Sequence, residues 1–327
     1  MTLDSIKYSV LNQLLAVDQI IRTRLASDVV LVNQVSEYII QSGGKRVRPL
    51  IAVLAGNACI QQPSPSALDQ LASTAAIVEF IHTATLLHDD VVDSSELRRG
   101  QDTANAVWGN QASVLVGDYL YSRAFEMMVE LGSMRVMDVM ASATNKIAEG
   151  EVLQLMNAHD PDTTEARYLD VIYRKTAKLF ESGAQIAAII ANASTEHERA
   201  LAEYGKYLGT AFQLVDDVLD YRASAEEMGK NLGDDLAEGK PTLPLIYALR
   251  NGNTQQQQVI RTAIEDGGLE SITAVTEIIE ATGGLKYTAL QARQQTDLAL
   301  QAISVLPQSD YKQSLINLAE FAVSRSY

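Results

Sequence analysis

The sequence predicts an all-α protein built as one helical bundle. Apolar residues recur at three- and four-residue spacing almost throughout the 327 residues, which is the period of helices with one buried face. Alternating apolar and polar runs bounded by turns, which would indicate strands, are scarce. Hydrophobic residues make up 47% of the chain and there are only seven prolines, so a large, rarely interrupted core is expected. No shift in composition divides the chain, and residues 1–327 are predicted to form a single domain.

Residues that begin or end helices separate the predicted elements. Gly43-Gly44 ends the second helix, and Pro63 and Pro65 separate the third from the fourth. A turn at Asp160-Pro161-Asp162 precedes Thr163 or Thr164 as an N-cap. Several helices are apolar over more than half of their circumference, as in the interior of a large bundle. We expect helices over residues 4–25, 28–41, 47–60, 66–93, 110–131, 134–157, 163–192, 195–221, 242–250, 254–264, 269–281, 283–304 and 309–324.

Charge and cysteine content exclude several classes of function. The net charge of −15 argues against a nucleic-acid partner, which usually requires a basic face. The single cysteine, Cys59, allows neither an intramolecular disulfide nor a thiolate zinc site. Residues 1–15 lack a signal-peptide core, and no uncharged apolar stretch is long enough to predict a transmembrane segment. A cytoplasmic protein is therefore expected.

Two acidic segments of identical spacing follow long apolar runs. They are Asp89-Asp90-Val91-Val92-Asp93 and Asp216-Asp217-Val218-Leu219-Asp220. Residues four apart share one face of a helix, with Cβ atoms about 5–6 Å apart. Asp89 and Asp93 therefore present two carboxylates to one point, and so do Asp216 and Asp220. Each cluster lies near the negative end of its helix, so a strong positive charge is needed to balance it.

Mg²⁺ is the ion that this arrangement favours. It takes hard oxygen ligands, commonly one or two carboxylates together with substrate phosphates. A solvated acidic helix face is an alternative for either segment alone, but the repeated spacing makes that interpretation the weaker one. Calcium storage is a further alternative, and the lack of a glycine-bearing EF-hand loop counts against it.

Basic residues lie near both acidic segments and predict diphosphate clamps. Arginine offers planar bidentate hydrogen bonds to phosphate, and lysine offers a point charge. A solvated surface residue is the alternative for each of them, above all for Arg46 and Lys178 and least for Arg98 and Arg99. No Walker A or GxGxxG sequence supports a nucleotide site. The basic positions are Lys45, Arg46, Arg48, Arg98, Arg99, Arg174, Lys175, Lys178, Lys230 and Lys240.

At these residues the sequence resembles the trans-isoprenyl diphosphate synthases. Their hallmarks are two DDxxD motifs, an Arg-Arg pair after the first, and an upstream Gly-Lys-Arg-x-Arg-Pro segment. These stand here at 89–93, 216–220, 98–99 and 44–49, and Lys175-Thr176, Phe212-Gln213 and Lys230 match in order. The resemblance covers roughly residues 30 to 325. It implies the isoprenoid-synthase helical bundle with a central apolar cavity, and a homodimer.

The resemblance also implies roles for individual residues. Isopentenyl diphosphate would be held by Lys45, Arg48, His82 and Arg99, and the allylic diphosphate by Arg98, Lys175 and Lys230, with Lys240 nearby. Asp89, Asp93 and Asp216 would bind two or three Mg²⁺ ions directly. Asp90, Asp217 and Asp220 would ligate directly, bind metal waters or support the ligands, and Thr176 and Gln213 would line the site near the reacting carbons. For His82, a buried core histidine remains an alternative.

The implied reaction joins an allylic diphosphate, farnesyl diphosphate being the expected primer, to several isopentenyl diphosphates. Four stretches, 80–93, 112–118, 148–156 and 233–245, are similar to long-chain members, which implies an all-trans octaprenyl product for quinone side chains. The tail is expected to run along the helix that ends at Asp89, which would be about 40 Å long. Thr85, one turn before Asp89, and Ala84 are small, and Ile81 lies one turn farther, so these three are predicted to set the chain length.

Three other functions remain open. A class I terpene cyclase would share the fold, but its usual second motif has Ser or Thr where Asp220 stands, followed by a Glu where Ser224 stands. A non-catalytic subunit of a heteromeric prenyl synthase would tend to lose its acidic motifs, and both are whole here. A helical scaffold protein would carry the acidic clusters as solvated faces and would not bind Mg²⁺-diphosphate.

Overall fold

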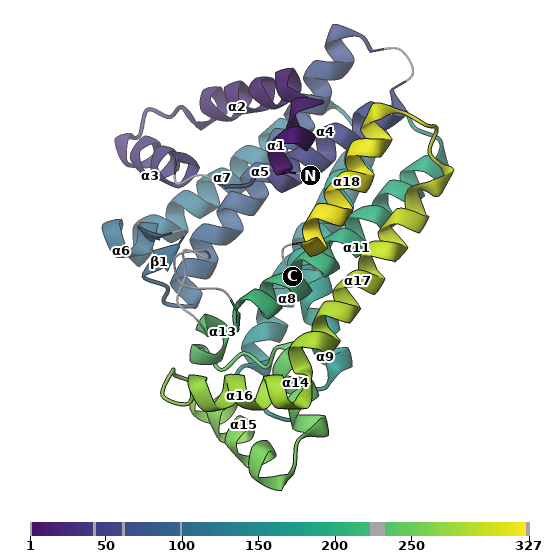
Figure 1. Ribbon diagram of the computed structural model, residues 1–327. Helices are drawn as coiled ribbons and strands as arrows, with labels where there is room; N and C mark the ends of the chain where they lie inside the picture. Colours follow the sequence, from purple (N-terminus) through teal and green to yellow (C-terminus); the bar gives the residue numbers. More distant parts are fainter. Residues whose placement is uncertain (1, 42–43, 61–62, 99, 223–232, 325–327) are drawn as a thin grey trace. The chain divides into compact units, whose positions relative to one another are not determined.

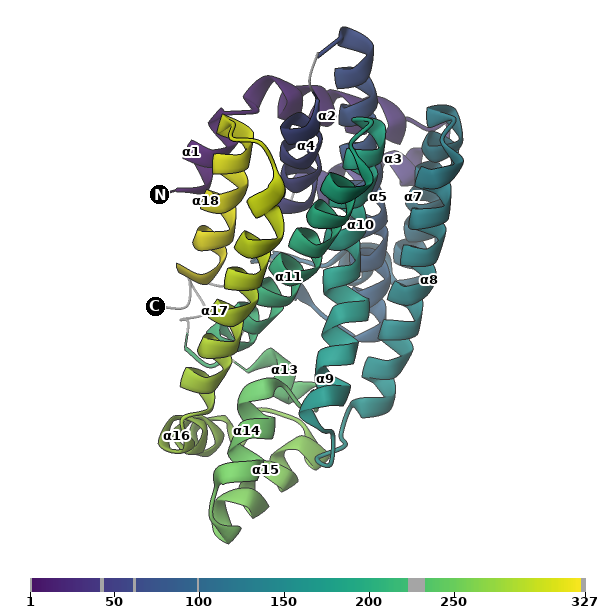
Figure 2. The same cartoon turned by 90° about the vertical axis from the view of Figure 1, so that its right-hand side faces the viewer.

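The protein is described by a computed structural model that covers residues 2–41, 44–60, 63–98, 100–222 and 233–324 (Figures 1 and 2). Within these ranges the only strands are β1 (Leu97–Arg98) and β2 (Gln101–Asp102), an antiparallel pair, so the all-α prediction is confirmed. The α-helices are α1 (Leu3–Tyr8), α2 (Leu11–Leu25), α3 (Val30–Gln41), α4 (Val47–Cys59), α5 (Pro65–Val92), α6 (Ala104–Trp108), α7 (Asn110–Leu131), α8 (Met134–Asn157), α9 (Glu165–Ile172), α10 (Lys178–Ile190), α11 (Thr195–Leu219), α13 (Asp234–Ala237), α14 (Leu243–Asn251), α15 (Thr254–Asp266), α16 (Ile272–Thr282), α17 (Gly284–Ala302) and α18 (Asp310–Ser324). A π-helical turn, η1 (Tyr173–Ala177), joins α9 to α10, and a 3₁₀ turn, η2 (Ile303–Val305), follows α17.

Tertiary contacts divide the chain into two compact units. Unit 1 comprises Met1–Thr144, Leu179–Gly205 and Ala302–Leu318. Unit 2 comprises Asn145–Lys178, Lys206–Gln301 and Ala319–Tyr327. Each boundary falls within a helix rather than in a loop. The single domain expected from the sequence stays a prediction.

Helix α5 is the longest element of unit 1 and forms its core. It begins with Pro65 at the first helical position, after Ser64 accepts a hydrogen bond from the N–H of Ala67 (3.2 Å). It packs against α2, α4 and α7, and Figure 1 shows α7 beside it. The predicted range 66–93 is confirmed to within one residue. Among the described helices, α5 is the one that is long and apolar enough to cross a membrane, but 72% of its most apolar window is buried inside the protein, and a core helix passes the same test.

A glycine allows α5 and α7 to approach closely. A Cβ on Gly117 of α7 would lie 2.4 Å from Nε2 of His88 on α5, so a larger residue there would displace the imidazole from this position. That ring lies 3.2 Å from the carbonyl of Val114, and the Ser113 hydroxyl donates to the carbonyl of Leu87 (2.8 Å). The contact between the helices is thus polar as well as apolar, and it fixes the helix that carries the first acidic segment.

Unit 2 is built around two apolar clusters. Helices α14, α15 and α16 surround one of them, which includes Ile260, Ile264 and Ile279. The other joins α9, α11, α14 and α17, and the fully buried Val215 on α11 belongs to it. Because Val215 directly precedes Asp216, this packing determines where the second acidic segment begins.

Several predicted elements differ from those observed. Residues 4–25 form two helices because a turn at Ser9 interrupts them, and the Ser9 hydroxyl lies within hydrogen-bonding distance of the Ile6 carbonyl (2.8 Å) and the Ser314 hydroxyl (3.0 Å). The range 163–192 contains the π-helical turn η1, and α6 occupies part of a predicted loop. Thr164 is the N-cap of α9, as expected, with its hydroxyl accepting from the N–H of Arg167 (3.3 Å).

Candidate active site

In unit 1, one stripe of α5 is less buried than the rest of the helix. His82, Thr85, Leu86 and Asp89 are partly exposed, whereas nearly all of their neighbours from Leu71 onward are buried. Their spacing of three and four residues places them on one face. The face ends at Asp93, the C-cap residue, whose N–H donates to the carbonyl of Asp89 (2.8 Å). The first and last aspartates of the motif are therefore both accessible at a helix end.

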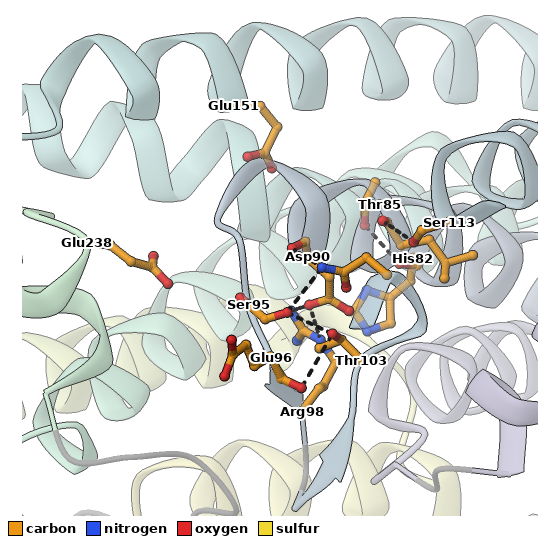
Figure 3. A network of polar contacts seen from close by, with 12 residues as sticks. His82, Thr85, Asp90, Ser95, Glu96, Arg98, Thr103, Ser113, Glu151 and Glu238 are labelled. Carbon is orange, nitrogen blue, oxygen red and sulfur yellow. Dashed lines mark hydrogen bonds and ion pairs between the residues drawn. The ribbon is translucent and has the colours of Figure 1, made fainter. Parts of the chain in front are cut away.

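Asp90, between them, has a different environment. Its side chain is only 1% exposed, and its Oδ1 accepts from Nε of Arg98 (2.7 Å) and lies 2.5 Å from Nη2 (Figure 3). Arg98 lies on β1, opposite Gln101 of β2. The short hairpin thus returns an arginine to the motif that precedes it, and the two predicted site residues form an ion pair whose carboxylate is buried and whose guanidinium is 20% exposed.

Backbone hydrogen bonds fix the turn between α5 and the hairpin. The N–H of Ser95 donates to the Asp90 carbonyl (2.9 Å), and the Thr103 hydroxyl donates to the Ser95 carbonyl (2.7 Å) (Figure 3). The Asn105 side-chain amide donates to both carbonyls (3.2 Å each). These contacts fix the chain where it turns back from α5 toward Arg98.

The start of α4 brings another pair of predicted residues together. Nη1 of Arg48 lies 3.0 Å from Nε2 of His82, and the guanidinium carbon lies 4.6 Å from the centre of the buried Phe180 ring. His82 is therefore a partly exposed residue with a cationic neighbour rather than an isolated core histidine. Lys45 is exposed, two residues before α4 begins.

In unit 2, a chain of hydrogen bonds links the mid-chain motif to the second acidic segment. The Thr176 hydroxyl lies 3.1 Å from Oε1 of Gln213, and Nε2 of Gln213 donates to Oδ1 of Asp217 (3.0 Å). The hydroxyl of the buried Tyr168 donates to Oδ2 of the same carboxylate. Both oxygens of Asp217 are thus hydrogen-bonded to neighbouring side chains.

Burial dominates the electrostatics of Asp217. It is 1% exposed, and desolvation, reinforced by the negative charge of Asp235, raises its pKa to about 7. The hydrogen bonds from Tyr168 and Gln213 act in the opposite direction. The pKa of the Tyr168 phenol is raised well above its usual value, chiefly by burial and secondly by Asp217. Tyr168 therefore stays a hydrogen-bond donor.

The outer aspartates of the second segment differ in exposure. Asp216 is exposed near the end of α11, whereas Asp220 is 4% exposed and its carbonyl accepts from the N–H of Gly233 (3.0 Å). The first aspartate of each motif is therefore accessible and the second is buried.

The π-helical turn η1 carries Lys175 and Thr176. Such turns are rare and often occur at functional sites. Nζ of Lys175 lies 2.6 Å from Oε2 of Glu151 on α8, and a Cβ on the adjacent Gly150 would lie 2.7 Å from the backbone nitrogen of Lys175. The close packing of α8 against η1 thus requires a glycine. Lys240 forms an ion pair with Glu238.

Two predicted site residues, Arg99 and Lys230, lie outside the described residues. Of the predicted chain-length residues, Thr85 is partly exposed, while Ala84 and Ile81 are fully buried. Across the ranges that the structure describes, no three histidine, cysteine, aspartate or glutamate side chains gather into a group that would hold an ion by themselves.

Sequence reasoning missed several residues that hold these side chains in place. Glu79, Glu151, Tyr168 and Asn105 each pair with a predicted site residue or its neighbour. Tyr168 and Asn105 have no spacing relationship to the motifs, so no signal in a single sequence reveals them. Glu79 lies three residues before His82 on the same helix face, which a search for charged residues on that face would have found.

Comparison with known proteins adds independent evidence. The Polyprenyl synthetase family model matches residues 29–282. The chain is 52% identical over 326 residues to an octaprenyl diphosphate synthase of Escherichia coli, covering 99% of both chains. It is 47% identical to an all-trans-nonaprenyl-diphosphate synthase (geranyl-diphosphate specific) of Rhodobacter capsulatus, covering 95% of this chain and 94% of that one. A polyprenyl synthase from Caulobacter crescentus, crystallised with calcium and isoprenyl diphosphate, has a TM-score of 0.94 and 42% identity, covering 100% of this chain and 98% of that one.

Proposed function

The chain belongs to the polyprenyl synthetase family, and we propose that the prenyltransferase it forms extends farnesyl diphosphate to octaprenyl diphosphate for quinone side chains. Its reaction is the condensation of an allylic diphosphate with isopentenyl diphosphate to a long-chain all-trans product. Likeness to solved polyprenyl synthases confirms the predicted isoprenoid-synthase bundle. The octaprenyl length is supported by the product of the Escherichia coli relative, which matches the chain end to end.

The proposal for individual residues rests on one observation: in both motifs the first two aspartates lie in opposite environments. In each motif the second aspartate is 1% exposed and holds neighbouring side chains, while the first is accessible. Asp90 holds Arg98, and Asp217 holds Gln213. This pattern supports Asp89 and Asp216 as ligands of a cation and favours a supporting role for Asp90 and Asp217, among the alternatives that the sequence left open.

Divalent ions are the second part of the proposal. The family is Mg²⁺-dependent in general, and the accessible carboxylates of Asp89, Asp93 and Asp216 are hard oxygen donors of the kind that Mg²⁺ prefers. We assign these three residues to two or three Mg²⁺ ions. When bound, the ions would neutralise the negative charge of the diphosphate as pyrophosphate leaves.

The cationic side chains divide between the two substrates. We assign Lys45, Arg48, His82 and Arg99 to isopentenyl diphosphate, and Arg98, Lys175, Lys230 and Lys240 to the allylic diphosphate. Arg98 is fixed by Asp90, so its guanidinium is aligned before substrate binds. Thr176 and Gln213 contribute hydroxyl and amide dipoles near the reacting carbons.

The chemistry is an electrophilic alkylation. The C–O bond of the allylic diphosphate breaks and pyrophosphate leaves with the electron pair. The double bond of isopentenyl diphosphate attacks the resulting cation, and the proton that is then lost passes to pyrophosphate. Buried apolar faces such as that of α5 exclude the water that would quench a cation.

The protein is proposed to act as a cytoplasmic homodimer. A group of exposed apolar residues on α8 supports the dimer: Val152 (58% exposed), Leu155 (66%) and Met156 (68%) lie at three- and four-residue spacing on one helix face. Exposed apolar side chains in groups often mark subunit contacts. Sedimentation velocity at micromolar concentration distinguishes a dimer from a monomer.

A product assay tests the proposed function. Purified protein is incubated with farnesyl diphosphate, labelled isopentenyl diphosphate and Mg²⁺, and the products are sized after dephosphorylation. We expect an eight-unit all-trans chain, and no product after chelation of the metal. A cyclic hydrocarbon would favour the cyclase alternative, and an absence of product would favour the non-catalytic subunit.

A further inference from the structure

We propose that Glu79 is a positioning residue for isopentenyl diphosphate, because its carboxylate pairs with Arg46 and holds the turn that carries Lys45 and Arg48. This inference rests on the proposed function, in which Lys45, Arg48 and His82 bind that substrate. Neither Glu79 nor Arg46 has a substrate role in that assignment.

The turn that carries these cations is strained. Arg46 has φ 51° and ψ 37°, the left-handed conformation, and it directly precedes α4. Among the described residues, only Ser94, His159 and Asn192 are other non-glycine residues with positive φ. Arginine lacks the short polar side chain that eases this conformation for asparagine, so the turn needs a contact that holds it.

The ion pair with Glu79 supplies that contact. Nη1 of Arg46 meets Oε1 of Glu79 on α5, and the two side chains are only 22% and 11% exposed. A carboxylate this deeply buried is costly unless it is paired. At the same residue, the Arg46 carbonyl accepts from the N–H of Leu50 (3.1 Å), the first hydrogen bond of α4. Arg46 therefore connects the helix start to α5 through its side chain.

A second polar contact lies beside the first and involves Arg48. Glu79 and His82 are three residues apart on α5 and share a face. Arg46 meets Glu79, and Arg48 meets His82 (3.0 Å between Nη1 and Nε2). Phe180 lies against the guanidinium of Arg48, with 4.6 Å between its carbon and the ring centre. The backbone conformation of Arg46 sets the direction of the chain between Lys45, which precedes it, and Arg48, which follows. Loss of the Glu79 carboxylate would therefore displace both cations.

The alternative is that the ion pair only stabilises the fold. A purely structural pair would change thermal stability and affect both substrates alike. A positioning role instead predicts an effect confined to isopentenyl diphosphate, because Lys45 and Arg48 are the residues that the turn carries.

Glu79→Gln tests this distinction by steady-state kinetics, each substrate being varied at saturating levels of the other. We expect the KM for isopentenyl diphosphate to rise about tenfold, since a charge-assisted hydrogen bond is replaced by a neutral one. The KM for farnesyl diphosphate should stay within about twofold.

The matched control is Glu198→Gln, also in unit 1. The Glu198 side chain is 9% exposed against 11% for that of Glu79, and it accepts from Arg135 (2.6 Å) and Gln185 (3.0 Å). Its variant should change neither KM.

Two variants of Arg46 keep the test decisive if Glu79→Gln folds poorly. Both Arg46→Ala and Arg46→Gly lose the ion pair, but only glycine adopts positive φ without strain. Arg46→Gly should therefore raise the KM for isopentenyl diphosphate less than Arg46→Ala does. An unchanged KM in all three variants, or an equal rise for both substrates, would overturn the proposal. Titration calorimetry with isopentenyl diphosphate separates this outcome from failure of the proposed function, because binding is measured even if the wild-type protein makes no product.

Discussion

Adjacent aspartates of one motif can differ in burial and therefore in function. Asp90 is buried against Arg98, whereas Asp89 and Asp93 on either side are partly exposed. The helical period explains this arrangement. Residues 89 and 93 share one face of the helix, whereas residue 90 is rotated by about 100° around the helix axis and faces the interior. A carboxylate that leaves the accessible face must find a partner inside the protein, and the hairpin supplies one.

Variants of the two aspartates should therefore fail in different ways. Asp89→Ala removes a proposed metal ligand and should lower turnover at least about a hundredfold with little change in Tm. Asp90→Asn leaves Arg98 without its counter-charge and should cost about 3 kcal/mol of folding free energy. Thermal unfolding and turnover measured on both proteins check this contrast. A stable Asp90→Asn protein with wild-type KM for the allylic substrate would contradict the anchoring role.

Cys59 offers a prediction that is independent of the active site. Burial raises the pKa of its thiol to about 11. Only the thiolate reacts with alkylating agents, and at pH 8 about one thiol in a thousand would be ionised. Iodoacetamide should therefore modify the native protein slowly at pH 8 and react at the rate of a free cysteine after unfolding in urea, as followed by mass spectrometry. Equal rates in the two states would show that the thiol is not protected.

Among the elements, the π-helical turn η1 depends on its neighbour. Its insertion places Arg174 and Lys175 next to Gly150 of α8, where a Cβ would lie 2.8 Å from Cβ of Arg174 and 2.7 Å from the backbone nitrogen of Lys175. A clash with backbone cannot be relieved by a rotamer change, so the turn itself must shift.

Gly150→Ala should therefore displace Lys175 and impair catalysis. We expect a loss of about 1–3 kcal/mol in stability from overpacking, and a fall in kcat that exceeds the change in KM for isopentenyl diphosphate. Gly183→Ala is the matched control, because a Cβ there meets Val78 methyl groups at 3.4 Å, an ordinary contact. If both variants have wild-type kcat, the turn does not depend on Gly150.

Helix α5 leads to a prediction about product length. Thr85 is partly exposed on the same face as Asp89, and its hydroxyl donates to the carbonyl of His82 (2.8 Å). Thr85→Phe should block the tail one turn below the metal ligands and shorten the product, as measured by chromatography. Ala84→Tyr is also predicted to shorten it, but Ala84 is fully buried, so that variant should lose stability as well. Product of parental length from a folded Thr85→Phe protein would show that the tail follows another path.

Some of these elements could be predicted and others could not. The range of α5 could be predicted because its apolar run is too long for a strand and because Pro63 and Pro65 mark its start. The hairpin at 97–102 has strands of two residues, too short to show a period. The π-helical turn depends on a glycine of another helix, Gly150 of α8, and the sequence of residues 173–177 alone does not reveal that contact.

For the molecule as a whole, the motifs indicated the chemistry but not the supporting contacts. Spacing predicted that Asp89 and Asp93 share a face, and both are partly exposed. The same prediction for Asp216 and Asp220 is wrong in its outcome, because α11 ends at Leu219 and Asp220 is buried while Asp216 is exposed. The pairing of Asp217 with Tyr168, and of Arg46 with Glu79, joins residues 49 and 33 positions apart, and only the tertiary fold brings them together.

The most direct test of the account is a crystal structure of the whole protein with Mn²⁺ in place of Mg²⁺ and with inorganic pyrophosphate. Anomalous scattering locates the metal ions. We expect ions at about 2.0–2.2 Å from carboxylate oxygens of both Asp89 and Asp216, with pyrophosphate oxygens completing their coordination. Ions that bind only one of the two acidic segments, or pyrophosphate that binds away from the ions, would contradict the claim that the two segments act together on a departing diphosphate.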